Sequence, residues 1–159
     1  MIVSDAGPII IFARIGWLSL LRDVAGFLLI PDAVYDEIVF KKGGMPGADQ
    51  VAQALWIQRA PVIDRSIIGA LPGVLHEGER EAIALAKERT AQLLIDEIRA
   101  RRAARELGIE VIGTLRILYE AKQLGHINLV RPIIVQMQSC GYRIDRALIR
   151  RFLERIGEA

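Results

Sequence analysis

The chain has 159 residues, of which 52% are hydrophobic, and its formal net charge is only +2. This length is typical of one domain and allows a sizeable core without metal or disulfide staples. The apolar residues form short runs, none of which is long enough to span a membrane. The lone Cys140 cannot form an internal disulfide, and no Cys/His cluster has zinc-site spacing, so we expect a cytoplasmic protein with no membrane contact.

Predicted strands alternate with predicted helices along the chain. The strands are expected at 2–4, 27–30, 92–95 and 109–112. The helices are expected at 8–14, 17–22, from Pro31 to 41 or 42, at 76–89, after the strand at 92–95 up to 107, and at 114–123, 127–138 and 145–156. The middle is less regular, with a short helix at 48–54, an extended or irregular stretch at 56–62 and a turn at 71–73. This alternation predicts one α/β domain over 1–159 with a mainly parallel sheet.

Two predicted strands each end on an aspartate. Asp5 follows the apolar start of the chain, and Asp96 follows the run LLI. The carboxyl ends of parallel strands form the ligand crevice of an open sheet, so both side chains can converge on one site. Either aspartate could instead cap the helix that follows it.

A third acid borders the buried stripe of the helix that starts near Pro31. Val34 and Ile38 are four residues apart and mark that stripe, and Glu37 lies beside them. Asp36 points about 200° away from Val34 and should face water. We therefore favour Glu37 over Asp36 as a site residue.

A fourth acid, Glu79, belongs to the helix expected at 76–89. It lies three residues before Ala82 and four before Ile83, on the side that faces the core. A carboxylate there is costly unless it is paired or bound to metal. The other charged residues of this stretch can be solvated, namely Glu77, Arg80 and Glu81. Glu37 and Glu79 could also be half-buried partners of arginine.

The four acids together suggest a metal site. Carboxylate oxygens suit Mg²⁺ or Mn²⁺, which keep water ligands when bound to proteins. Such ions support hydrolysis of phosphodiesters. Arginines gather in two places, either of which could meet phosphate or form a solvated helix face: Arg99, Arg101, Arg102 and Arg105, and Arg143, Arg146, Arg150, Arg151 and Arg155.

Five segments resemble, in order, the motifs of PIN-domain proteins: SDAGPII, PDAVYDEI, GEREAIALA, LLIDEIRARRAA and IGTLRIL. The resemblance extends to about residue 122 and is closest to a prokaryotic subfamily long labelled as of unknown function. It differs at Ala6, where many relatives have Ser or Thr, and at Ile98, where Arg is common. The C-terminal helices, from about 126, resemble the subfamily more loosely.

The resemblance implies a PIN-like three-layer α/β/α fold with an acidic pocket that binds Mg²⁺ or Mn²⁺ and cleaves RNA, as in VapC-type toxins. It implies that the catalytic residues are Asp5, Glu37, Glu79 and Asp96, of which Asp5, Glu79 and Asp96 hold the metal. Ser4, Thr114 and Glu97 are expected to support the pocket. Arg101 and Arg102 are expected to contact the nucleic acid.

The expected function is a metal-dependent endoribonuclease, the toxin of a toxin–antitoxin pair. The alternative is a catalytically inactive PIN-like module for RNA binding or protein assembly. A Rossmann nucleotide site is disfavoured because no GxGxxG follows the first strand. The aliphatic helices over 9–21 suggest a homodimer seam or an antitoxin groove, although they could simply be core helices.

Overall fold

The computed structural model describes residues 1–41, 44–45 and 47–159. Its centre is a five-stranded sheet in the order β3-β2-β1-β4-β5, in which every neighbouring pair is parallel. The predicted parallel sheet is therefore confirmed. The strands are β1 (Ile2–Ser4), β2 (Leu28–Pro31), β3 (Ile57–Ala60), β4 (Gln92–Leu94) and β5 (Val111–Ile112).

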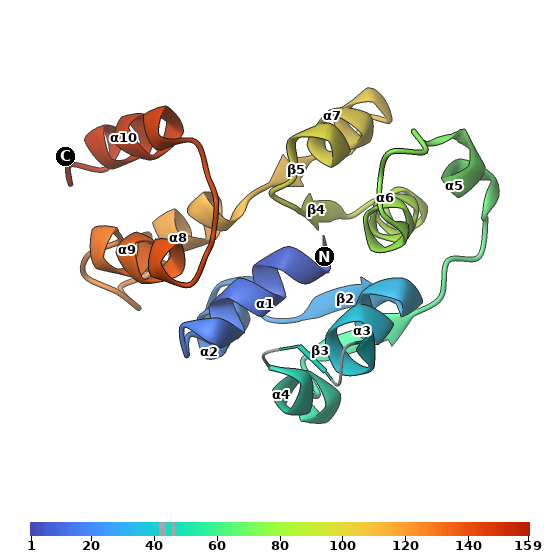
Figure 1. Cartoon of the computed structure of the whole chain (residues 1–159), viewed down its shortest axis with the longest axis horizontal. Helices are drawn as coiled ribbons and strands as arrows, with labels where there is room; N and C mark the ends of the chain where they lie inside the picture. Colours follow the sequence, from blue (N-terminus) through green and yellow to red (C-terminus); the bar gives the residue numbers. More distant parts are fainter. Residues whose placement is uncertain (42–43, 46) are drawn as a thin grey trace.

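Helices cover both faces of this sheet. In Figure 1 the sheet separates α1, α2 and the C-terminal helices on the left from α5 and α6 on the right, which confirms the three-layer α/β/α arrangement. The helices are α1 (Ala6–Arg14), α2 (Leu18–Ala25), α3 (Asp32–Val39), α4 (Ala48–Gln53), α5 (Ser66–Ala70), α6 (Glu77–Arg89), α7 (Ile98–Glu106), α8 (Thr114–Gln123), α9 (Arg131–Ser139) and α10 (Arg146–Arg155).

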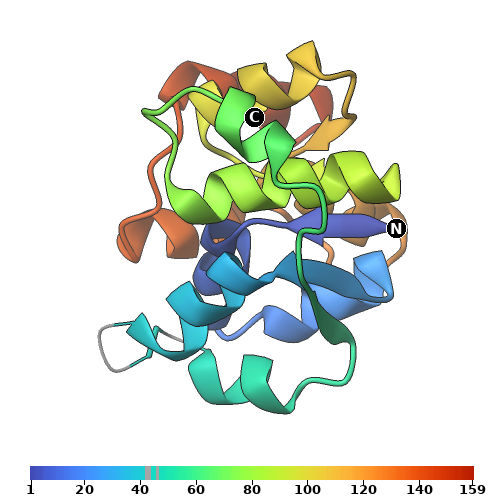
Figure 2. The ribbon, with the colours of Figure 1, turned by 90° about the vertical axis from the view of Figure 1, so that its right-hand side faces the viewer.

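Helix α6 is the central helix of its layer. It packs on β1, β2 and β4 and also contacts α3 and α7. Figure 2 shows it running beside β1. The run Ala82–Ala86 is fully buried, and its three alanines let the helix lie close to its neighbours. This packing fixes where the first turn of α6, with Glu79, stands relative to the strand ends.

Glu158 attaches the C-terminal segment to the rest of the domain through hydrogen bonds and an ion pair. Its buried carboxylate accepts hydrogen bonds from the backbone N–H groups of Val130 and Arg131, at 3.0 and 2.9 Å, and pairs with Lys122 at 2.7 Å. These bonds join the end of the chain to the start of α9 and to α8. They hold α10 in a defined place beside the rest of the domain.

Some boundaries differ from the sequence prediction. The extended stretch at 56–62 contains β3, which pairs with β2 from Leu28↔Ile57 to Pro31↔Ala60. Pro31 ends β2 and caps α3 rather than opening the helix, and α3 ends at Val39, while residue 42 lies outside the described residues. Helix α9 begins at Arg131, four residues later than predicted, with a proline in its first turn. Helix α5 was not predicted.

The helices over 9–21 do not expose the aliphatic surface that the sequence suggested. Ile9, Ile11, Phe12, Leu20 and Leu21 are all buried in the core. Helix α1 packs against α2, α3 and α9, so core packing accounts for these buried residues, and the homodimer stays a prediction. None of the helices over the described residues is long and apolar enough to cross a membrane.

Candidate active site

Asp5 and Asp96 lie at the carboxyl ends of neighbouring strands, as predicted. Ser4 of β1 pairs with Leu94 of β4, and the Asp5 backbone N–H donates to the Leu94 carbonyl at 3.0 Å. Asp96 follows Leu94 by two residues. The pairing of β1 with β4 therefore brings the two aspartates to the same edge of the sheet.

Glu37 reaches the same edge from α3. A methyl group placed at Gly78, in the first turn of α6, would lie 3.5 Å from Glu37 Oε2 and 3.8 Å from Asp5 Oδ1. The two carboxylates thus both border this glycine. Gly78 lets the first turn of α6 come close to both acids, and Glu37 faces them as the helical stripe predicted.

Glu79 stands in the first turn of α6 and is only 8% exposed, as its place on the buried stripe predicted. Its Oε2 accepts a hydrogen bond from the His76 backbone N–H at 3.0 Å, which closes a capping box. Burial raises the pKa of Glu79, the bond from His76 opposes the rise, and the charges of Glu97 and Glu37 add to it. Glu79 therefore combines a structural role with a place among the acids.

Asp5 carries the strongest electrostatic signal of the four acids. Burial, together with repulsion from Glu79, Glu37 and Asp96, raises its pKa from 3.8 to about 7, against a hydrogen bond from the Ala6 backbone. All three other predicted acids therefore act on one carboxyl group. A partly buried carboxylate among like charges costs stability, and carboxylates with such raised pKa values occur most often at functional sites.

Asp96 is held by the start of α8. The Thr114 backbone N–H donates to Asp96 Oδ1 at 2.8 Å, and the Thr114 hydroxyl donates to Oδ2. Arg101 lies on its other side, with Nη1 donating to the Ile95 carbonyl at 2.7 Å. A methyl group at Gly113 would stand 2.8 Å from Arg101 Nη1 and 3.0 Å from Asp96 Oδ1. The GT pair therefore fits tightly against both charged groups.

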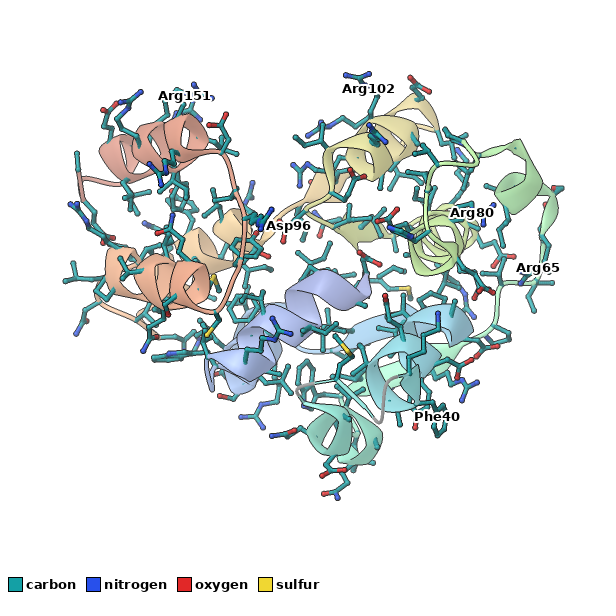
Figure 3. The ribbon with its side chains drawn as sticks, in the orientation of Figure 1. Phe40, Arg65, Arg80, Asp96, Arg102 and Arg151 are labelled. Carbon is teal, nitrogen blue, oxygen red and sulfur yellow. The ribbon has the colours of Figure 1, made fainter. Side chains whose placement is uncertain are left out.

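The remaining predicted residues take different positions. The buried Ser4 hydroxyl donates to the Asp5 carbonyl at 2.9 Å. Glu97, not Asp96, caps α7, and its Oε2 accepts from the Ala100 N–H at 2.7 Å. Arg102 is exposed on the outer side of α7, away from Asp96 (Figure 3). Of the two predicted RNA contacts, only Arg101 stands at the acidic edge.

Sequence reasoning missed two buried polar groups, one on Glu81 and one on Tyr142. Glu81 was expected in water but is 4% exposed, because it accepts from the Ala33 backbone N–H at 3.1 Å and pairs with Arg65 at 3.4 Å. Tyr142, between α9 and α10, places a buried hydroxyl without a hydrogen-bond partner among the described residues. Burial and the nearby charge of Asp96 raise its pKa. Tyr142 belongs to the segment GYRID at 141–145, which has no periodic pattern that would predict a side chain near Asp96.

The acids have the right chemistry for a divalent ion, but as they stand they do not form a complete set of metal ligands. Carboxylate oxygens are the donors that Mg²⁺ and Mn²⁺ prefer. Among the residues that the structure describes, no group of three or more His, Cys, Asp or Glu side chains is close enough to hold a metal ion. The hydrogen bonds to Glu79 and Asp96 hold both carboxylates toward backbone groups.

Comparisons with known proteins agree with this architecture. The structure resembles a PilT N-terminus domain protein from the hyperthermophilic archaeon Sulfolobus solfataricus, with a TM-score of 0.58 and 17% identity over 76% of this chain and 93% of that one. A search of curated proteins finds no match. The family model DUF3368, described as a PIN domain, matches residues 1–158. PIN domains are generally nucleases and typically use divalent metal ions. The chain belongs to the PIN-domain family.

Proposed function

We propose that this protein is a metal-dependent endoribonuclease that hydrolyses RNA phosphodiesters with Mg²⁺ or Mn²⁺. The observation that carries the proposal is Asp5, a carboxyl group whose pKa is raised to about 7 by burial and by three neighbouring acids. Such an arrangement destabilises the charged pocket unless a cation neutralises it. Membership of a family of nucleases supports the same conclusion.

Asp5, Glu79 and Asp96 would hold the ion, and Glu37 would complete the acidic pocket beside Asp5. A bound divalent ion supplies phosphate neutralisation and a water of lowered pKa. Thr114 orients the Asp96 carboxylate through two hydrogen bonds, and Ser4 holds the backbone at Asp5.

Arg101 is the residue best placed to meet the substrate. Its guanidinium is half-buried beside Asp96, and one nitrogen is fixed by the Ile95 carbonyl. A planar guanidinium has further N–H donors that can bind phosphate oxygens. Burial and the charge of Arg105 lower the pKa of Arg101, which still carries its charge at neutral pH.

The test is cleavage of end-labelled RNA by purified protein with Mn²⁺, Mg²⁺ or EDTA. The variants Asp5→Asn and Asp96→Asn should lose cleavage, whereas Asp49→Asn, at an exposed position on α4, should keep it. A labelled DNA of the same sequence tests whether the protein cleaves RNA in preference to DNA. Cleavage that persists in EDTA or in Asp5→Asn would contradict the proposed site.

We further propose that the nuclease acts as the toxin of a toxin–antitoxin pair. Induced expression of the wild-type chain should then stop growth, and expression of Asp5→Asn should not. A small antitoxin protein that binds the chain should restore growth. Equal growth of cells that express the two forms would contradict the toxin role without contradicting the nuclease.

One observation favours a second candidate, an inactive PIN-like module that binds RNA or assembles with protein. Glu79 and Asp96 already accept hydrogen bonds from the protein, and the described acids form no group of three. Calorimetric titration with Mn²⁺ separates the candidates. Heat of binding that disappears in Asp5→Asn supports the nuclease, and the absence of binding by wild-type protein supports the module.

A further inference from the structure

A groove of about 900 Å³ opens beside Asp96, between α7 and α8 on one side and α10 on the other. Helix α10 contributes one face to it, which includes Leu148, Arg151 and Phe152. In Figure 3, Asp96 lies between α10, marked by Arg151, and α7, marked by Arg102. The groove is therefore continuous with the acidic edge and has a wall built from the C-terminal part of the chain.

The charge of the groove is strongly positive. Its lining contains five arginines against two aspartates: Arg101, Arg116, Arg143, Arg151 and Arg155, with Asp96 and Asp145. Arg116 pairs with Glu120 at 2.7 Å. No ion pair joins Arg143, Arg151 or Arg155 to an acid within the part of the chain that the structure describes. Three guanidinium groups thus remain available to an anionic partner.

Apolar side chains stand exposed between these charges. Ile98 is 72% exposed, Leu148 41% and Tyr119 37%, and all three line the groove. Phe152, also in the lining, packs partly against the core. The groove therefore offers apolar and aromatic surface together with free arginines, which is the combination that single-stranded nucleic acid binds through bases and phosphates.

We propose that this groove binds single-stranded RNA on one side of the cleaved bond, with α10 as the wall that holds the strand. The proposal rests on the proposed nuclease function and assigns a role to the three members of the second arginine bunch that line the groove. Arg143, Arg151 and Arg155 contact phosphates, and bases lie on Tyr119 and Phe152. A duplex would hide its bases from that surface, so the groove selects single strands.

The test is fluorescence anisotropy with a labelled single-stranded RNA in EDTA, where metal-dependent cleavage is blocked. The test variant combines Arg151→Gln with Arg155→Gln, which line the groove. The matched control combines Arg146→Gln with Arg150→Gln, which are exposed on the same helix outside that lining. Both variants remove the same charge from α10, so only the position of the charge differs.

The groove variant should bind RNA about 25-fold more weakly at about 0.1 M salt, with a salt slope shallower by about 1.4, as expected for two lost phosphate contacts on a single strand. The control variant should lose much less RNA affinity. Tyr119→Ala should weaken binding without changing the salt slope, because stacking releases no counterions. Duplex RNA of the same sequence should bind more weakly than the single strand.

Equal affinities of the groove variant and the control would overturn the proposal. Loss of binding to a poly-glutamate probe by the groove variant, with RNA affinity retained, would assign the groove to an acidic protein segment instead. Equal binding of duplex and single strand would overturn the selectivity. Since the assay needs no catalysis, a wild-type protein that binds RNA through the groove but cleaves none would contradict the nuclease alone.

Discussion

Asp5→Asn is expected to stabilise the metal-free protein at neutral and alkaline pH. Burial and the neighbouring acids raise the pKa of Asp5 from 3.8 to about 7. The folded protein therefore holds this proton more tightly than the unfolded chain does. The resulting stability is fully present below pH 3.8, declines as pH rises and is lost above about pH 7. At about 1.4 kcal/mol per pKa unit, a rise of about three units corresponds to about 4 kcal/mol.

An uncharged asparagine removes this pH dependence. The free energy of unfolding of the variant should therefore exceed that of the wild type by up to about 4 kcal/mol at about pH 8 and equal it near pH 4. Urea unfolding in EDTA at both pH values measures the difference, with Asp49→Asn as the control at an exposed position. Saturating Mn²⁺ should then stabilise the wild type and leave Asp5→Asn unchanged. A variant that is no more stable than the wild type at the higher pH would refute the reasoning.

Three further predictions concern the rest of the molecule. Glu158→Ala should lower the free energy of unfolding by about 3 kcal/mol in urea titration, since it leaves Lys122 without its partner; a loss no larger than in the exposed Glu154→Ala would contradict this. Thr114→Val should reduce cleavage about tenfold at unchanged fold by circular dichroism, because it removes the hydroxyl bond to Asp96 Oδ2 and leaves only the backbone bond to Oδ1; full activity would contradict the positioning role. Light scattering after size exclusion should give twice the mass of one chain, and a single-chain mass would reject the predicted homodimer.

The candidate site could be predicted because its residues belong to periodic or strand-end patterns. Asp5 and Asp96 follow apolar strands, and parallel pairing carries both to one edge. Glu37 and Glu79 sit on helical faces that point inward, and the structure places both near Asp5. These patterns involve residues that are close in the sequence, so they can be recognised without the tertiary structure.

The parts that were missed depend on contacts between distant segments. The helical period assigns Glu81 to water, but the start of α3 supplies Ala33 N–H and the segment before α5 supplies Arg65. Strand β3 reads as irregular because two of its four residues are exposed, and only its pairing with β2 defines it. Tyr142 lies near the charge of Asp96 but belongs to a loop, and a loop has no periodic pattern from which its position could be predicted.

The most direct measurement of the central claim is a time course of RNA cleavage by wild-type protein and Asp5→Asn, both with Mn²⁺, with EDTA added to a parallel wild-type reaction. Metal-dependent hydrolysis predicts products only in the wild-type reaction with Mn²⁺. Products at an equal rate in Asp5→Asn, or in EDTA, would contradict a catalytic site built on the acids around Asp5.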